Sequence, residues 1–218
     1  VGLHDQREDF IDISLKLLRF NLASHKSGEG SCLDGKSWGH TWISVLGIER
    51  MMHAIEALEP HLTAEDVAQL KRTLISEAKW LLQHLDIVAG EVDNNKPESN
   101  IWNGAFLHRV AMLYPEIPEA ESMRIKGTHF LINGISTRDD ENNTSSYDGI
   151  QVSEAFCGGN FFPSYALNHH HYLNVGYMVI CLSNIAMLHY SYRHHGIPAP
   201  EALYHRAKEL WSVIKPLI

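Results

Sequence analysis

Apolar residues recur at intervals of three and four along most of the chain, which is the spacing of amphipathic helices. The first such segment has two adjacent apolar stripes, one of Phe10, Ile13, Leu17 and Phe20 and the other of Ile11, Leu15, Leu18 and Leu22. This segment predicts a helix that ends near Gly28. A second helix is predicted from Ser37, which can cap it, to the residue before Pro60.

The third predicted helix has the clearest start in the chain. Thr63 followed by Asp66 resembles a capping box, in which side chains and backbone N–H groups at the helix start satisfy one another. The apolar spacing continues to Leu85, and a polar break over residues 91–99 then separates this helix from the next. We therefore expect a well-defined helix over these two dozen or so residues.

Four more helices follow in the pattern. They are predicted from Trp102 to Tyr114, from Pro118 to Asn133, over residues 173–188, and from Leu203 to Ile214. The segment 173–188 is apolar nearly all round, so we expect it to be an inner helix packed on several sides. The predicted fold class is all-α, built from antiparallel helical hairpins.

One long stretch, residues 136–171, has no helical spacing and is rich in Asn, Gly, Ser, Asp and aromatic residues. A loop of that length inside a compact domain is usually functional. Asp148-Gly149 predicts a hairpin turn within it. Its carboxylates, including Asp140 and Glu154, are expected to be solvated rather than catalytic.

Composition narrows the function further. The 218 residues carry 18 Lys plus Arg against 26 Asp plus Glu, a formal charge of −8, and this balance argues against a nucleic-acid partner. No apolar stretch is long enough to span a membrane, and three scattered cysteines form neither a disulfide framework nor a zinc pattern. The length suggests a single helical domain over residues 1–218. Because the chain opens on Val1, we expect a processed or truncated chain.

Histidine is unusually frequent, with 15 residues, and three of these are consecutive. His169, His170 and His171 follow Asn168 and precede Tyr172, directly before a predicted helix that also carries Tyr177. A helix N-terminus favours anions, so this cluster suits the binding of a carboxylate or sulfate. His169 and His171 could share one face of an extended strand and bind a metal, but no third ligand stands at a recognisable spacing. We expect no metal and no cofactor.

Three segments of the chain resemble polysaccharide lyases of the heparinase II/III-like and alginate-lyase-like family. They are Asn160 to Tyr177 with its Asn168-His169 pair, Ser99 to Gly104 together with Met112 to Pro115, and Trp38 to Trp42. The resemblance covers the chain from about Trp38 onward. It implies an (α/α) toroid, and the predicted helices would form an incomplete one. The rest of its own chain would then be a partner.

The resemblance implies β-elimination on a uronate, in which the substrate carboxylate is neutralised while the C5 proton is removed. Asn168 and His169 fit the neutralising roles, as hydrogen-bond donors placed where negative charge develops. The family's catalytic Tyr lies on a helix beyond this pair, a position that the chain does not comfortably reach. Either Tyr172 or Tyr177 would then serve as acid and base, or the chain is a fragment that lacks half of its site.

Substrate-binding side chains are expected on either side of this pair. Trp38, Trp42 and Trp102 offer flat aromatic faces on which pyranose rings can stack, although Trp38 and Trp42 also fit a helix core. His40 and Asn103 lie next to these tryptophans, and His171 belongs to the histidine cluster itself. The expected partner is an acidic polysaccharide or oligosaccharide, and the expected location is secreted or periplasmic.

Two other functions remain open at this stage. A glycoside hydrolase on a similar helical toroid would need two carboxylates about 5 to 10 Å apart, and none falls inside the Asn168-His169 segment. A noncatalytic carbohydrate-binding protein would keep the cleft without the acid and base. The sequence does not identify the polymer, its sulfation, or an endo or exo mode of action.

Overall fold

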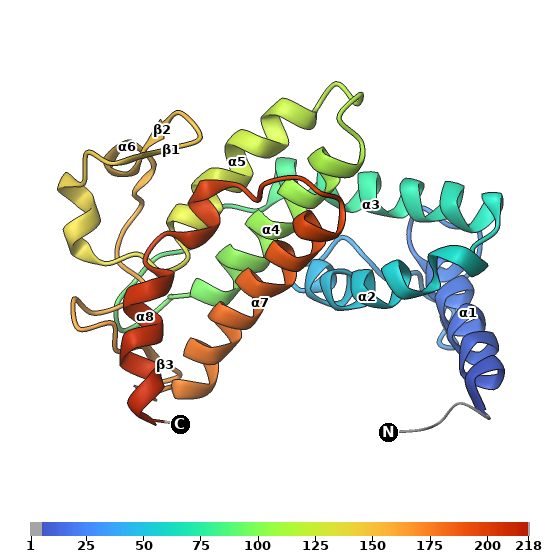
Figure 1. Cartoon of the computed structure of the whole chain (residues 1–218), viewed down its shortest axis with the longest axis horizontal. Helices are drawn as coiled ribbons and strands as arrows, with labels where there is room; N and C mark the ends of the chain where they lie inside the picture. Colours follow the sequence, from blue (N-terminus) through green and yellow to red (C-terminus); the bar gives the residue numbers. More distant parts are fainter. Residues whose placement is uncertain (1–5, 218) are drawn as a thin grey trace. The chain divides into compact units, whose positions relative to one another are not determined.

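The computed structural model describes residues 6–217, and these are mostly helical, which confirms the all-α class (Figure 1). The α-helices are α1 (Arg7–Ser24), α2 (Ser44–Leu58), α3 (Ala64–His84), α4 (Pro97–Leu113), α5 (Ala120–Ile132), α6 (Val152–Ala155), α7 (Val175–His194) and α8 (Ala207–Ile214). The strands are β1 (Ser146–Tyr147), β2 (Ile150–Gln151), β3 (Asn168–His169) and β4 (Tyr172–Leu173). Across residues 6–217, every helix falls short of the length and apolarity that crossing a membrane requires.

The chain divides into two compact units, Val1–Leu81 and Leu82–Ile218. The first contains α1, α2 and most of α3, and the second contains the remaining helices and both hairpins. A single helical domain over residues 1–218 stays a prediction.

In the first unit, the two apolar stripes of α1 differ in their burial. Leu18 and Leu22 of the one stripe are buried, whereas the other, Phe10, Ile13, Leu17 and Phe20, is exposed along its whole length. The capping box of α3 is confirmed, because Asp66 accepts from the backbone N–H of Thr63 at 2.9 Å and donates its own N–H to the Thr63 hydroxyl at 3.2 Å. Asp66 also accepts two hydrogen bonds from Arg19, which tie α1 to the start of α3.

The second helix begins later than its sequence pattern predicts. α2 starts at Ser44 rather than after Ser37. Gly39 has φ +107° and His40 has φ +54°, and neither angle belongs to a right-handed helix. A Cβ on Gly39 would lie 2.3 Å from His25 Nε2, so this close approach requires a glycine.

In the second unit the central helix is α4. Fifteen of its 17 residues are buried, and both α5 and α7 pack against it, side by side in Figure 1. The expectation that the segment 173–188 would be the helix buried on several sides is wrong. The buried residues of α7, among them Met178, Cys181 and Leu188, form a single stripe, while Val179 on another face is exposed. Buried asparagines and a buried Arg109 made α4 look less apolar than its position is.

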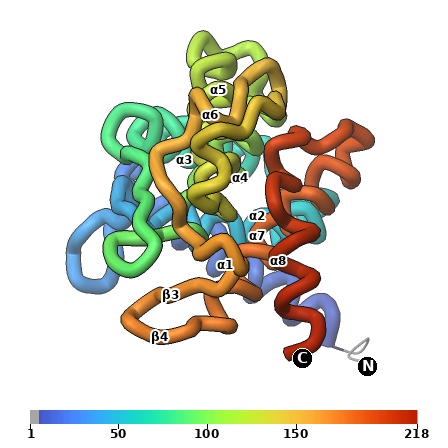
Figure 2. Tube along the Cα trace, turned by 90° about the vertical axis from the view of Figure 1, so that its left-hand side faces the viewer, coloured from blue at the N-terminus to red at the C-terminus, as the bar shows by residue number. Residues whose placement is uncertain are grey.

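The long loop contains the predicted hairpin and a second one. Asp148 and Gly149 have φ of +52° and +82° and join β1 to β2, which confirms the predicted turn. A second two-stranded hairpin, β3–β4, projects as a narrow loop in Figure 2. Its turn, formed by two histidines, carries none of the residue pairs typical of hairpin turns.

One loop carboxylate is buried, against the expectation of solvated acids. Asp140 is inaccessible, and its Oδ1 accepts from Arg206 at 2.7 Å while its Oδ2 lies 3.3 Å from Nε2 of His205. The hydrogen bonds from these two side chains outweigh burial and hold the pKa of Asp140 well below its usual range. Arg206 has φ +57°, so α8 begins after it, at Ala207, rather than at Leu203 as predicted.

Three buried asparagines, Asn100, Asn133 and Asn160, form what we call the asparagine network. The side-chain amides of Asn100 and Asn160 both donate to the backbone carbonyl of Asn133, at 2.8 and 2.7 Å. The same two amides donate to the carbonyl of Val88, so the loop after α3 is joined to α4 and to the long loop. The Asn133 side chain in turn donates to Ala155 O. The network therefore fixes backbone that no helix or sheet supports.

The Asn133 side chain donates to the carbonyl of Ala155 at 2.7 Å and accepts from the backbone N–H of Cys157 at 2.8 Å. Replacement of Asn133 by Ala removes both bonds and should lower the free energy of unfolding by about 2 to 4 kcal/mol. Urea unfolding followed by circular dichroism measures the change. Asn142→Ala, at an exposed asparagine, is the matched control and should cost less than about 0.5 kcal/mol. Equal effects of the two substitutions would contradict a structural role for the network.

Candidate functional site

The predicted Asn168-His169 pair forms strand β3, and the next two residues form the turn of the β3–β4 hairpin. His170 and His171 have φ of +59° and +67°, values that few side chains adopt and that histidine adopts more readily than most. Backbone strain of this kind persists only where surrounding contacts hold it, and it gathers at functional sites. The turn replaces the extended strand on which His169 and His171 would have shared a metal.

His169 lies at the centre of a compact cluster. Its side chain is almost fully buried, and its Nδ1 is 2.6 Å from Oδ1 of Asn95. Its ring centroid is 4.2 Å from that of His170 and 4.3 Å from that of Tyr177. Burial, followed by the nearby charges of His170 and Lys96, lowers the pKa of His169, so the ring is neutral at pH 7.

Asn174 joins the hairpin to α7. As the N-cap residue, its side-chain oxygen accepts from the backbone N–H of Tyr177 at 3.2 Å, while its amide donates to the carbonyl of His169 at 3.4 Å. The start of α7 is thereby fixed next to His169, and anion binding at this helix end stays a prediction.

Asn168 shows one unusual feature. Its Oδ1 is buried and has no hydrogen-bond partner among the described residues. Its amide nitrogen, in contrast, does not belong to the buried atoms without a partner. A buried polar atom without a partner costs free energy, so such an atom in a native site calls for an explanation. Asn168, directly before His169, therefore offers a side-chain N–H donor that is not enclosed by the protein.

Other predicted site residues of the second unit lie at different depths. Tyr177 is half-buried and its hydroxyl is 3.4 Å from Nε2 of His170, while Tyr172 and His171 are exposed. Trp102 and Asn103 are buried within α4, where a stacking role for Trp102 would require its indole to become accessible. These binding and catalytic roles stay predictions.

Trp38 and His40 belong to the first unit. Trp38 is half-buried and donates from its indole nitrogen to Asn21 O at 2.8 Å. His40 stacks on Trp80 with parallel rings, and its Nε2 is 2.9 Å from the hydroxyl of Ser76. Each side chain is anchored to a helix by these contacts.

The sequence pattern missed a buried histidine and carboxylate beside His40. His25 and Glu77 are inaccessible, with Nε2 of His25 2.8 Å from Oε1 of Glu77, and both lie close enough to His40 to share a metal ion. The backbone N–H of Ser27 donates to Nδ1 of His25, which places the ring proton on Nε2, facing the carboxylate. A metal needs a lone pair at that nitrogen, so the hydrogen bonding favours a structural pair over a metal site.

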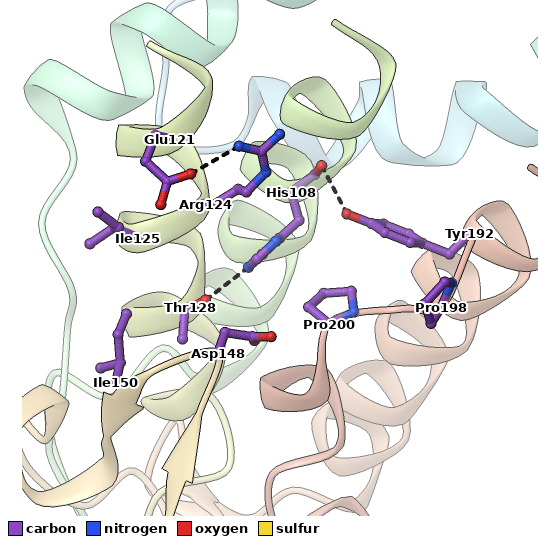
Figure 3. Close-up of a pocket in the computed structure, with 10 residues that line it drawn as sticks. All are labelled: His108, Glu121, Arg124, Ile125, Thr128, Asp148, Ile150, Tyr192, Pro198 and Pro200. Atoms are coloured by element: carbon purple, nitrogen blue, oxygen red, sulfur yellow. Dashed lines mark hydrogen bonds and ion pairs between the residues drawn. The ribbon is translucent and has the colours of Figure 1, made fainter. Parts of the chain in front are cut away.

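A separate pocket of about 240 Å³ lies between α4, α5, the β1–β2 turn and the end of α7 (Figure 3). His108 and Thr128 line it, with Nε2 of His108 3.2 Å from Oγ1 of Thr128. Arg124 forms an ion pair with Glu121, and Asp148 lies at the edge of the pocket. Burial lowers the pKa of His108 to about 4, so this histidine is also neutral at pH 7. The sequence pattern singled out none of these residues except Asp148.

Comparison of the chain with protein-family models, with curated proteins and with solved structures found no match. Any proposal for the function therefore rests on the geometry of the site and on the sequence motifs.

Residues 91–96, which the sequence pattern marks only as a polar break, supply contacts to the site. Asn95 reaches His169, and Lys96 is fixed by its backbone N–H to Oδ1 of Asn160 at 3.3 Å. Asn95 and Lys96 stand more than 70 positions before His169, so no local spacing connects them. The run of polar residues directly before Pro97, the first residue of α4, was the one available signal.

Gly39→Ala should destabilise the first unit by about 3 kcal/mol or more, because a Cβ would lie 2.5 Å from Oε1 of Glu77 in a backbone conformation at φ +107°. Gly35→Ala is the matched control, since Gly35 also has positive φ, +77°, but no atom within 4 Å. It should cost only about 1 kcal/mol of backbone strain. Thermal unfolding of both variants measures the difference, and equal losses would contradict the close packing of Gly39.

His108 should make the stability of the second unit fall in mild acid. Its pKa is about 4 in the folded state against an ordinary 6.5, so the unfolded chain binds more protons below pH 6.5. Stability from this group is complete above pH 6.5 and decreases as the pH falls toward 4, by about 3 kcal/mol in total. His108→Gln should flatten this part of the curve of unfolding free energy against pH. An unchanged slope would show that His108 is not buried in its neutral form.

Proposed function

We propose that this chain is part of a polysaccharide lyase that cleaves a uronate-containing acidic polysaccharide by β-elimination. The observation that carries the proposal is the cluster of a neutral, almost fully buried His169 between Asn95 and Tyr177, at the start of α7. An imidazole kept neutral at working pH suits proton transfer, and a phenol beside it supplies a second acid or base.

The reaction sets the requirements for such a site. A base removes the C5 proton, the electron pair of the C5–H bond forms the C4=C5 double bond, and the C4–O bond breaks. The departing oxygen takes a proton from an acid. Negative charge develops on the uronate carboxylate during this sequence, so hydrogen-bond donors or cations must lie beside it.

Named residues match these requirements. The accessible amide of Asn168 can donate to the uronate carboxylate. The N-terminus of α7 and the charge of Lys96, which acts on His169, add positive potential near the site. The ring centroid of Tyr177 is 4.3 Å from that of His169, so we assign the role of the acid to its phenol, and Tyr172 at the hairpin is exposed to an incoming chain. This local arrangement opposes the overall charge of −8 and permits an anionic substrate.

The broader setting belongs to the same proposal. The antiparallel helices would form an incomplete (α/α) toroid, and the protein would act where such polymers occur, in the periplasm or outside the cell. Within the second unit, Trp102, Asn103 and His171 would contact the polymer beside the reacting uronate. Trp38 and His40 belong to the first unit and remain predicted substrate-binding residues.

Asn168→Ala and His169→Ala should each lower kcat by about 10²-fold or more, because each removes an interaction that acts at the transition state. The assay screens alginate, heparan sulfate, chondroitin and hyaluronan with the full chain, and follows the near-ultraviolet absorbance of the 4,5-unsaturated product. His195→Ala, at the exposed far end of α7, is the matched control and should retain full activity.

The assay also separates the competing functions. New reducing ends without the absorbance would indicate a glycoside hydrolase, and saturable binding without either signal would indicate a noncatalytic carbohydrate-binding protein. Absorbance that His169→Ala leaves unchanged would contradict the proposed site.

A further inference from the structure

Asn95 contacts both residues of the Asn168-His169 pair, although it lies more than 70 positions earlier in the chain. It is buried in the turn just before α4. Its Nδ2 is 2.5 Å from the backbone carbonyl of Asn168, and its Oδ1 is 2.6 Å from Nδ1 of His169. These contacts join strand β3 to the start of α4.

The chemistry of the two contacts fixes the orientation of the Asn95 amide. A backbone carbonyl can only accept, so the NH₂ group must face Asn168 O, and it also points toward the carbonyl of Glu91 at 3.5 Å. The carbonyl oxygen of the side chain must then face His169. Since that oxygen can only accept, Nδ1 of His169 must carry the proton.

We infer that Asn95 is a positioning residue that holds His169 in its Nδ1–H form and leaves Nε2 as the proton acceptor of the site. The inference rests on the proposed function for its catalytic meaning, but the proton position is a property of the protein alone. His169 then takes the C5 proton on Nε2, and neutralisation of the carboxylate is left to Asn168 and the neighbouring positive charge.

The surroundings of His169 agree with a ring that waits in its neutral form. Within residues 6–217, Nε2 of His169 makes no hydrogen bond. It is also not one of the buried side-chain atoms that lack a partner, so it is not enclosed by the protein. The groups that face the ring are the His170 imidazole, the Tyr177 ring and the Lys96 ammonium, and none is an anion that would stabilise the imidazolium. After proton uptake, the Nδ1–H to Asn95 bond remains and becomes charge-assisted.

The test measures ¹⁵N chemical shifts of the histidine rings in the full ¹⁵N-labelled chain at pH 7.5, with the His169 signals identified by their loss in His169→Gln. In the wild type we expect a protonated Nδ1 and an unprotonated Nε2. A protonated Nε2 with a free Nδ1 would overturn the inference, whatever the variants do.

Two substitutions at Asn95 test its role. Asn95→Asp keeps an acceptor opposite Nδ1, so the proton position should persist while the new charge raises the pKa of His169 by about one unit or more. Asn95→Ala removes the acceptor, and a mixture of the two ring forms should appear. Asn142→Ala, at an exposed asparagine, should change neither property. A His169 spectrum that is identical in the wild type and Asn95→Ala would also overturn the inference.

Activity on whichever of alginate, heparan sulfate, chondroitin or hyaluronan is cleaved completes the test. Asn95→Ala should lower kcat about tenfold or more with little change in KM, and Asn95→Asp should move the acidic limb of the pH profile upward with the pKa of His169. If no polymer is cleaved and the ring proton is found on Nδ1, the proposed function fails while the role of Asn95 stands. If cleavage occurs with the proton on Nε2, the role of Asn95 fails and the lyase activity stands.

Discussion

The backbone carbonyl of Asn133 is the point on which the second unit depends. Two buried side-chain amides, from Asn100 and Asn160, donate to this one oxygen, and the same amides hold the carbonyl of Val88. Helix α4, the end of α5 and the long loop therefore share one buried set of hydrogen bonds. A loop of about 35 residues has few ladder hydrogen bonds of its own, and buried backbone groups must find partners elsewhere. The asparagine side chains supply those partners.

The candidate site follows from this constraint. Asn160 also accepts a hydrogen bond from the backbone N–H of Lys96, so the asparagine network holds the turn before α4. Asn95, in the same turn, contacts His169. The imidazole is thus placed by a chain of amide contacts rather than by a regular sheet. Tight positioning of a reacting group lowers the barrier to reaction, because its orientation is set before the substrate binds. The strained turn at His170 and His171 adjoins this imidazole, and the ring centroid of His170 is 4.2 Å from that of His169.

Periodicity predicted most of the helices, because helix boundaries such as the Thr63–Asp66 capping box depend on local residues. The Asp148-Gly149 turn between β1 and β2 was predictable for the same reason. It failed where a distant contact decides the structure. Gly39 delays the start of α2 because His25 and Glu77 lie against it, and Asp140 is buried because Arg206 reaches it. The apolar segment 173–188 predicts a helix packed on several sides, yet α4 is the more buried helix. Polar side chains that are satisfied inside the protein, as in α4, look like surface residues in a sequence. Asn168 and His169 were found from their clustering, but Asn95 could not be, because no spacing rule links it to them.

The account stands on the claim that an acidic saccharide binds where Asn95, His169 and Tyr177 meet. Its most direct test is a titration of the ¹⁵N-labelled full chain with saturated tetrasaccharides of alginate, heparan sulfate, chondroitin and hyaluronan, followed by backbone amide shifts. The account predicts saturable changes for at least one of these, centred on residues 95–96 and 168–177. Changes centred instead on the pocket of His108 and Arg124, or none at all with any of the four saccharides, would contradict it.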